Sequence, residues 1–224
     1  MNKLGKRLEV IASLVDRKRI ADVGCDHGKL AYYLLDNGIS DYAVVSDISR
    51  PSLNKAIDIL SKTKYNFDYI CCDGLSGYSG YNVDQAIIAG MGGDEIIKIV
   101  SNSPINISSY ILSPQHNNID VKKFMLNNGY SIDYDIIVKE KNKFYNIFKC
   151  NKTKSAVEMS DYDLIIGKDN INNSLSDIDE FVAKELEKVT SIVNNNQVAN
   201  SKFEDYLNVL KEYQKRNVDL WKRC

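Results

Sequence analysis

Apolar and polar residues follow two alternating patterns over the first 130 positions of the chain. Five short apolar runs have the length of buried strands, and they cover residues 19–23, 42–46, 68–72, 83–89 and 109–112. Between these runs, apolar residues recur at every third or fourth position, which is typical of helices with one buried face. Strands that alternate with helices in this way predict an α/β fold with a mostly parallel, doubly wound, Rossmann-like sheet.

The predicted helices can be located from their apolar stripes and from the residues at their ends. They cover residues 3–16 and 27–36, a segment that starts near Pro51, and segments around 96–100 and 121–125. Asn37 and Gly38 suit the end of the second helix, and Pro51 suits the first turn of the third. Two further β-rich runs, 132–139 and 144–149, flank polar residues and predict a hairpin that adds an antiparallel edge to the sheet.

The pattern changes after residue 150. Residues 151–174 are mostly polar and are predicted to be a connector, although they contain a short apolar patch at 164–166. Residues 175–194 and 202–222 carry apolar residues at steps of three and four, which predicts an antiparallel α-helical hairpin with a coiled-coil-like seam. We therefore expect two domains, residues 1–160 and 161–224. The hairpin could bind a partner molecule, or it could serve only packing and assembly.

Polar or glycine residues follow each of the five predicted parallel strands. These strand-end clusters are Asp22 and Gly24, Asp47, Asp73 and Gly74, residues 90–93, and residues 113–115. The carboxyl ends of parallel strands meet at one edge of an open α/β sheet, and ligands bind at that edge. The sequence therefore predicts one ligand site to which all five strands contribute.

The chemistry of these clusters favours a cationic ligand that carries a ribose. A dinucleotide-binding turn needs a second glycine where this chain has Asp26, and a carboxylate there would repel a pyrophosphate. Asp47 can accept hydrogen bonds from both hydroxyls of a ribose. Asp73 can accept one from an adenine amine, with Gly74 leaving room for the ring, while Asp22 and the Gly24 turn would face an ammonium group or its hydration. S-adenosyl-L-methionine carries all of these groups, whereas each aspartate taken alone could also be a turn or helix-cap residue.

Composition narrows the function further. The 224 residues have a formal net charge of −1, so binding of a polyanion such as RNA would depend on local cationic groups. The five cysteines and two histidines lack the spacing of a zinc site, so we expect no metal and free thiols in a cytoplasmic protein. No apolar stretch approaches the length of about 18 residues that a membrane span needs, so we expect no association with membranes.

Two motifs of the chain together resemble those of one known family. The segments ADVGCDH (21–27) and IAGMGG (88–93) are closely similar to the bacterial tRNA (adenine-N1)-methyltransferases that modify adenine 22 of the D-loop. The resemblance covers nearly the whole chain, because residues 6–8 and 112–115 also match in order and the predicted helical hairpin is similar to that family's coiled-coil-type domain. It implies S-adenosyl-L-methionine-dependent methylation of N1 of that adenine in tRNA, on a Rossmann-like methyltransferase sheet.

The resemblance also implies roles for particular residues. Asp26 is the expected catalytic residue, because its carboxylate could accept a hydrogen bond from the adenine amine and stabilise the positive charge that the base acquires. The residues expected to bind the cofactor are Asp22, Gly24, His27, Asp47, Asp73, Gly74, Gly90, Met91 and Gly92. The residues expected to bind the substrate are Arg7, Gln115 and Tyr145. We expect a monomer that binds tRNA.

A second hypothesis is a non-catalytic nucleoside- or RNA-binding module on a methyltransferase-like fold. The extra carboxylate of Asp26 favours the enzyme, because a binding module has no need of it. The target base must be unpaired or flipped out, and aromatic residues expected to stack on it are Tyr32, Phe144 and Tyr145. The cationic residues expected to contact the RNA backbone are Lys3, Lys6, Arg7, Lys122, Lys123, the lysines of 139–143, Lys211, Lys215, Arg216, Lys222 and Arg223.

Overall fold

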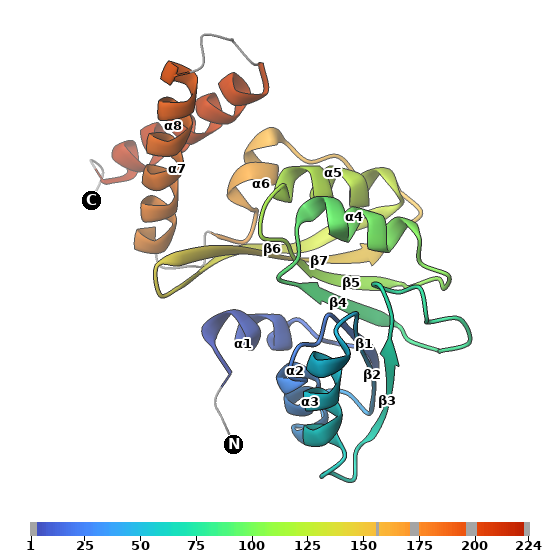
Figure 1. Ribbon diagram of the computed structural model, residues 1–224. Coiled ribbons are helices and arrows are strands. Elements are labelled where there is room, and N and C mark those ends of the chain that lie inside the picture. Colours follow the sequence, from blue (N-terminus) through green and yellow to red (C-terminus); the bar gives the residue numbers. More distant parts are fainter. Residues whose placement is uncertain (1–3, 156, 171–174, 196–200, 222–224) are drawn as a thin grey trace. The chain divides into compact units, whose positions relative to one another are not determined.

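The computed structural model describes residues 4–155, 157–170, 175–195 and 201–221. Seven strands of these residues form one sheet in the order β3-β2-β1-β4-β5-β7-β6 (Figure 1). The strands are β1 (Arg19–Val23), β2 (Tyr42–Asp47), β3 (Asn66–Cys71), β4 (Gln85–Ala89), β5 (Ser109–Ser113), β6 (Tyr130–Glu140) and β7 (Lys143–Lys152). Strands β1 to β5 pair in parallel, and β7 is antiparallel to β5. The predicted α/β fold with an antiparallel edge hairpin is therefore confirmed.

Helices cover both faces of this sheet. One face carries α1 (Lys6–Ser13), α2 (Lys29–Asp36) and α3 (Arg50–Leu60), and the other carries α4 (Gly93–Ser101) and α5 (Asn118–Asn127) (Figure 1). The side chains of β1, β2, β4 and β5 are almost all buried, because these central strands have a helical layer on each side. Strand β3 lies at the edge and is largely exposed, which explains why it tolerates polar residues.

Local signals set the ends of two of these helices. The Ser49 hydroxyl accepts a hydrogen bond from the Ser52 N–H (3.4 Å), and Pro51 follows in the first turn of α3. Gly38, with a φ of +66°, ends α2 as predicted, and its N–H donates to the carbonyl of Leu35 (3.1 Å). The first helix is shorter than the predicted 3–16, since α1 ends at Ser13.

The edge hairpin carries residues back to the carboxyl edge of the parallel strands. Its turn is only Lys141 and Asn142, shorter than the predicted turn of four residues, and Lys141 takes the left-handed conformation (φ +56°) that a tight turn needs. Leu112 on β5 pairs with Phe148 on β7. Because β7 runs antiparallel to β5, the first residues of β7 lie at the edge where the parallel strands end.

The chain divides into two compact units. The first comprises residues 1–134 and 138–157, and the second comprises residues 135–137 and 158–224. The second unit contains α6 (Asp161–Ile166), α7 (Leu175–Asn195) and α8 (Ser201–Trp221). On α8, Tyr206 donates to Glu185 of α7 and Tyr213 donates to Asp179 of α7, both at 3.1 Å. The residue that comes later on α8 contacts the residue that comes earlier on α7, so the two helices run antiparallel, which confirms the predicted helical hairpin.

Helix α6 corrects the prediction that residues 151–174 are only a connector. The Ser160 hydroxyl caps it by accepting a hydrogen bond from the Asp163 N–H (3.1 Å), and residues 164–166 are buried. Six residues are too few to show a helical period in the sequence, and the first half of the helix is polar.

Three residues of β6 belong to the second unit because a loop binds their backbone. The Asp135 N–H donates to Asp169 Oδ2 (2.8 Å), and the Asp169 N–H donates back to the Asp135 carbonyl (3.1 Å). The Ile137 N–H donates to Asn170 Oδ1 (2.7 Å). Residues 167–170 therefore form hydrogen bonds with backbone N–H and carbonyl groups at the outer edge of β6, as another strand would.

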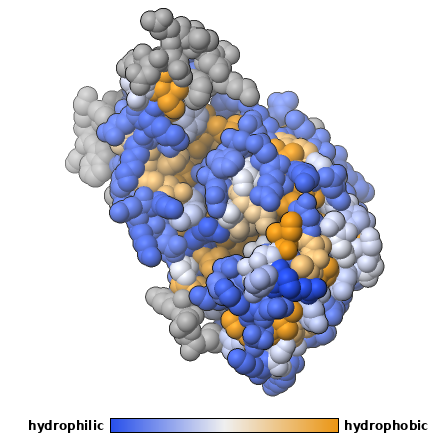
Figure 2. All heavy atoms as spheres, viewed as in Figure 1, coloured by the Kyte–Doolittle hydropathy of each residue, from blue (hydrophilic) through white to orange (hydrophobic). Residues whose placement is uncertain are grey.

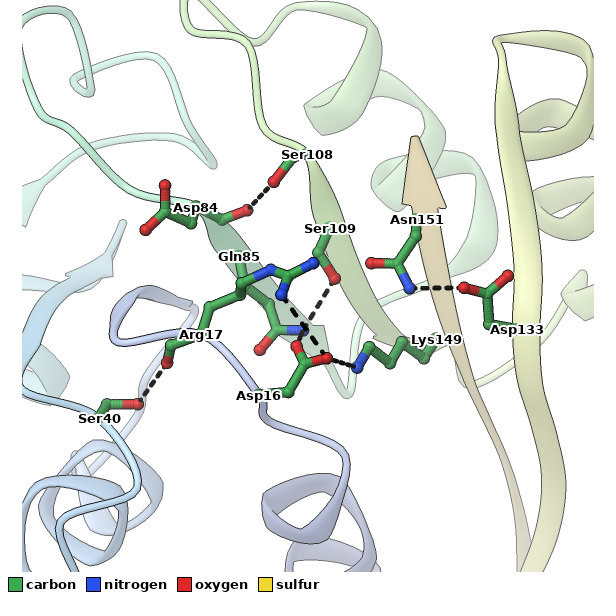
Figure 3. Close-up of polar contacts among 10 residues, drawn as sticks. All are labelled: Asp16, Arg17, Ser40, Asp84, Gln85, Ser108, Ser109, Asp133, Lys149 and Asn151. Atoms are coloured by element: carbon green, nitrogen blue, oxygen red, sulfur yellow. Dashed lines mark hydrogen bonds and ion pairs between the residues drawn. The ribbon is translucent and has the colours of Figure 1, made fainter. Parts of the chain in front are cut away.

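The amino ends of the strands carry a self-contained polar cluster (Figure 3). The buried Gln85 donates to the Ser109 hydroxyl (2.8 Å) and to Asp16 (3.4 Å), and Asp16 pairs with Lys149 on β7 (2.6 Å). This cluster ties the segment after α1 to β4, β5 and β7. Its acidic group has a basic partner, in contrast to several carboxylates at the opposite edge of the sheet.

The visible face in Figure 2 is mostly hydrophilic, with hydrophobic residues in patches between the polar ones. The large apolar side chains most exposed among the described residues are Ile48, Tyr69 and Val157. No described helix combines the length and the apolar character that a bilayer crossing requires. The described residues also contain no cluster of His, Cys, Asp and Glu side chains that could hold a metal ion.

Candidate active site

The turn between β1 and α2 lies directly against the end of β4. Gly24 has a φ of +72°, and a Cβ atom added to it would lie 2.2 Å from Cε of Met91. The N–H groups of Gly24 and Cys25 both donate to the Ser46 carbonyl, at 2.8 and 2.9 Å. Glycine is therefore favoured here mainly by the left-handed turn, and the flexible end of the Met91 side chain fills the space beside it. Two residues expected to bind the cofactor are thus brought together.

The Asp47 carboxylate is held in place by two backbone N–H groups. The Asp26 N–H donates to Oδ2 (3.1 Å) and the Ser49 N–H donates to Oδ1 (2.8 Å). Each carboxylate oxygen keeps a further lone pair, so the pair of oxygens can still accept both hydroxyls of a ribose. Asp26 reaches Asp47 because its backbone is left-handed (φ +47°), a conformation that is costly for a residue other than glycine.

The Asp26 side chain forms a chain of contacts with His27 and Lys55. Asp26 Oδ2 lies 2.6 Å from His27 Nδ1, and Lys55 Nζ on α3 lies 3.1 Å from His27 Nε2. An ammonium group can only donate, so Nε2 accepts and Nδ1 carries the proton that it donates to Asp26. The Asp26 side chain is 70% exposed, which leaves its other oxygen open to a ligand.

Asp22, near the end of β1, is expected to face the ammonium group of the ligand or its hydration. It is buried, and among the described residues its Oδ2 has no hydrogen-bond partner. Burial raises the pKa of Asp22 to about 7, the Asp47 charge adds to the rise, and the Ala31 N–H opposes it. A buried carboxyl group with an unsatisfied oxygen is suited to a cationic ligand, whose charge would restore ionisation.

Asp73 and Gly74, the residues expected to bind the adenine, are both in contact with α4. Asp73 pairs with Lys98 on α4 (3.4 Å), so the carboxylate expected to bind the adenine amine already has a cationic partner from outside the strand ends. A Cβ on Gly74 would lie 2.5 Å from Ile99, so the space at this glycine is used by α4 and not left for a ring. Ile48, which directly follows Asp47, is 72% exposed and is not among the site residues expected from the sequence. The sequence shows an isoleucine after a strand-end aspartate, but it does not show that this side chain is exposed.

The glycines after β4 let the segment after β5 approach closely. Cβ atoms on Gly92 and Gly93 would lie 2.8 Å from the His116 ring and 2.7 Å from the His116 carbonyl. The Gly90 N–H donates to the Ser113 carbonyl (3.0 Å), and the Gln115 N–H donates to the Met91 carbonyl (2.9 Å). The ends of β4 and β5 thus form one rigid backbone surface.

The three residues expected to bind the substrate come together around Gly90. The Arg7 guanidinium lies over the Tyr145 ring (4.9 Å to its centroid), and a Cβ on Gly90 would lie 3.3 Å from Arg7 Nη2. The Gln115 side-chain amide donates to the Gly90 carbonyl. Arg7 comes from α1, Gln115 follows β5 and Tyr145 lies on β7, so contacts among segments far apart in the sequence meet beside Gly90.

Other predicted contacts lie elsewhere. Tyr32 packs edge-on against Tyr65, and Phe144 lies near the Lys139 ammonium (6.0 Å). Lys122 is fully buried near the Phe148 ring, so it cannot contact RNA, because its hydrocarbon stem and ammonium lie inside the fold. Lys3, Lys222 and Arg223 lie outside the described residues.

The ligand-binding groups fit S-adenosyl-L-methionine. The buried Asp22 carboxyl matches its ammonium group, the fixed Asp47 carboxylate matches its ribose diol, and the Gly24 turn gives backbone access between them.

Comparisons with known proteins point the same way. The family profile described as "Methyltransferase domain" matches residues 4–148. A putative tRNA methyltransferase of Mycoplasma pneumoniae is 32% identical over 173 residues, which are 75% of this chain and 81% of that protein. The structure of M. capricolum TrmK with S-adenosyl-homocysteine is 25% identical, covers 95% of this chain and 98% of that one, and has a TM-score of 0.82. A putative tRNA (m1A22) methyltransferase of Streptococcus pneumoniae, solved with S-adenosyl-L-methionine, shares the fold at 24% identity and a TM-score of 0.78, over 94% and 99% of the two chains.

Proposed function

The chain belongs to the bacterial tRNA (adenine-N1)-methyltransferases that act on adenine 22, and we propose that its rim of strand ends transfers the methyl group of S-adenosyl-L-methionine to N1 of that adenine. The family expected from the two glycine-containing motifs is confirmed by the matches to tRNA methyltransferases. One observation carries the proposal. The Asp26 backbone fixes Asp47, while the Asp26 side chain stays exposed and oriented by His27.

Cofactor binding is assigned to one half of the rim. When bound, S-adenosyl-L-methionine supplies an electrophilic methyl group on a sulfonium. Asp47 would accept the ribose hydroxyls, Asp22 would face the ammonium, and the backbone at Gly24 would line the space between them. His27 has both ring nitrogens engaged by Asp26 and Lys55, so we assign it to orienting Asp26 more than to direct contact with the cofactor.

Catalysis is assigned to Asp26. Adenine N1 has an in-plane lone pair that can attack the methyl group, and the base gains positive charge as it does so. The exposed oxygen of Asp26 would accept a hydrogen bond from the 6-amino group, which strengthens as this charge develops. Because His27 holds the other oxygen and Lys55 in turn holds the His27 ring, the carboxylate would need little reorganisation during the reaction.

The other half of the rim is assigned to the target nucleotide. Arg7, Gln115 and Tyr145 surround Gly90, and Tyr145 offers a ring for stacking once the base leaves its helix. The buried Nε of Arg7 has no partner among the described residues, so this side chain is held mainly by Tyr145.

The helical residues 161–224 are assigned to tRNA binding, as a domain distinct from the catalytic residues 1–160. Lys211 and Lys215 are exposed on α8 and suit phosphate contacts. Arg216 is instead engaged by Glu212 and lies 4.7 Å from the Tyr162 ring, so it stabilises the helical unit. We assign the protein to the cytoplasm, where tRNA is found, and expect it to act as a monomer.

The proposal is tested by incubating the protein with methyl-labelled S-adenosyl-L-methionine and unmodified tRNA, then digesting the tRNA to nucleosides. The expected product is 1-methyladenosine, and a transcript with guanine at position 22 is the matched control. Tight binding of S-adenosyl-homocysteine without any transfer to tRNA would favour the alternative, a nucleoside- or RNA-binding module that performs no chemistry.

A further inference from the structure

We propose that Gln115 recognises the target adenine through its Hoogsteen edge, the N7 side of the base, and so leaves N1 free for methylation. The proposal rests on the proposed function and adds the means by which the enzyme distinguishes adenine from guanine.

Gln115 is fixed to the end of β4 twice. Its backbone N–H donates to the Met91 carbonyl (2.9 Å), and its side-chain Nε2 donates to the Gly90 carbonyl. A carbonyl oxygen can only accept, so the amide nitrogen must face Gly90 and the amide oxygen must face away from it. The orientation of this amide is therefore set by the backbone, although a glutamine side chain is otherwise free to flip.

The outward edge of this amide remains available to a ligand. Among the described residues, Gln115 Oε1 accepts no hydrogen bond, and the residue is exposed. One hydrogen of Nε2 is used by Gly90, which leaves the second hydrogen beside Oε1. An acceptor next to a donor is the arrangement with which glutamine binds N6 and N7 of adenine.

The reaction itself selects this edge of the base. A group that bound the Watson–Crick edge through N1 would block the atom that must attack. Adenine's 6-amino group has two hydrogens, so Gln115 can accept the one on the N7 side while Asp26 accepts the one on the N1 side. Guanine presents a carbonyl oxygen at position 6, which the Gln115 oxygen would repel, and its N1 carries a proton.

The neighbours of Gln115 support a base at this position. Arg7 reaches the same glycine, since its Nη2 lies 3.3 Å from where a Gly90 Cβ would be, and it covers the Tyr145 ring. Gly90 has a φ of +87°, so the carbonyl that holds Gln115 is turned by a conformation natural only to glycine. Any larger residue at position 90 would disturb the hydrogen bond from Gln115 and would crowd the Arg7 guanidinium.

The test compares adenine with 7-deazaadenine at the target position of one tRNA. The 7-deaza base lacks the N7 acceptor but keeps N1 and the 6-amino group. We expect the wild-type protein to show about five- to tenfold lower kcat/KM on the 7-deaza tRNA, the usual loss for one neutral hydrogen bond. Gln115→Leu should lose about 10- to 100-fold on adenine and should no longer distinguish the two bases.

Two controls keep the outcome clear. Asp26→Asn should slow both substrates and keep the wild-type ratio, because Asp26 does not contact N7. Affinity for S-adenosyl-homocysteine and the melting temperature should be the same for wild type and Gln115→Leu, since the side chain is exposed.

Three results are decisive. An unchanged adenine to 7-deazaadenine ratio in Gln115→Leu would overturn the role of Gln115, and so would equal rates on both bases with the wild-type protein. Failure of the wild-type protein to methylate adenine at all would instead reject the proposed function.

Discussion

The buried Asp22 carboxyl should make cofactor binding release a proton. Its pKa in the free protein is about 7, far above the usual value of 3.8, because it is removed from water and lies near the negative Asp47. An ammonium group bound beside it would lower that pKa by one to three pH units, as is usual for an opposite charge within about 4–6 Å. At pH 7 roughly half of the free molecules carry the proton and few of the complexes do, so binding should release about 0.5 proton.

Calorimetry can measure this proton directly. The enthalpy of S-adenosyl-homocysteine binding is determined at pH 7 in buffers with different ionisation enthalpies, and the slope gives the number of protons released. Asp22→Asn, which has the same shape but does not titrate, should give a slope near zero. A wild-type enthalpy that does not depend on the buffer would refute the assignment of Asp22 to the ammonium group.

The Asp22 carboxyl should also make the folded protein less stable as the pH rises from about 4 to 7. The pKa is higher in the folded than in the unfolded chain, so the stabilising contribution is complete below about pH 4 and is lost as the pH rises towards 7. A difference of about 3 units corresponds to at most about 4 kcal/mol. In the absence of cofactor, Asp22→Asn should therefore gain stability relative to wild type between pH 4 and 7, as measured by urea unfolding. A constant difference over this range would show that Asp22 is not perturbed.

Four further changes test other parts of the site. Asp47→Ala should weaken S-adenosyl-homocysteine binding by about 1.5–3 kcal/mol in calorimetry, the usual contribution of hydrogen bonds to a charged acceptor. Asp26→Asn should lower single-turnover methylation about a hundredfold at unchanged cofactor affinity, and near-normal turnover would reject its catalytic role. Gly24→Ala should lower the free energy of unfolding by about 1–3 kcal/mol in urea, mainly through its positive φ, because the flexible end of Met91 can move. Lys211→Glu with Lys215→Glu should weaken tRNA binding in a filter assay and reduce its salt dependence by about two ions, whereas an unchanged slope would exclude both from phosphate contact.

Much of the parallel sheet could be predicted because its four central strands, β1, β2, β4 and β5, are buried on both faces. Strands of this kind are continuous apolar runs, and each ends where polar residues begin, so the position of Asp47 at a strand end follows from the pattern. The donors that hold its carboxylate could not be predicted. One of them is the Asp26 N–H, which points to Asp47 only because Asp26 adopts a left-handed conformation that its residue type does not favour.

Contacts between distant segments were beyond the reach of local patterns. The Arg7–Tyr145 stack joins residues from α1 and β7, and only resemblance to a family put both on the substrate side. The prediction that Lys122 contacts RNA was wrong, because it rested on charge alone and this lysine lies inside the fold, although lysine is usually exposed. Lys55 was also missed, because a lysine on an amphipathic helix gives no sign that its ammonium reaches His27, in the turn before the preceding helix.

Residues 135–137 of β6 belong to the helical unit, and this limits how that unit could be transferred to another protein. A chimera that joined residues 158–224 to another methyltransferase would leave behind the backbone groups of Asp135 and Ile137, to which Asp169 and Asn170 bind. Gly167 adds a second constraint, since a Cβ there would lie 3.0 Å from the Asp135 carbonyl. Transplanting α6, α7 and α8 would therefore require grafting residues 135–137 of this chain's own edge strand as well.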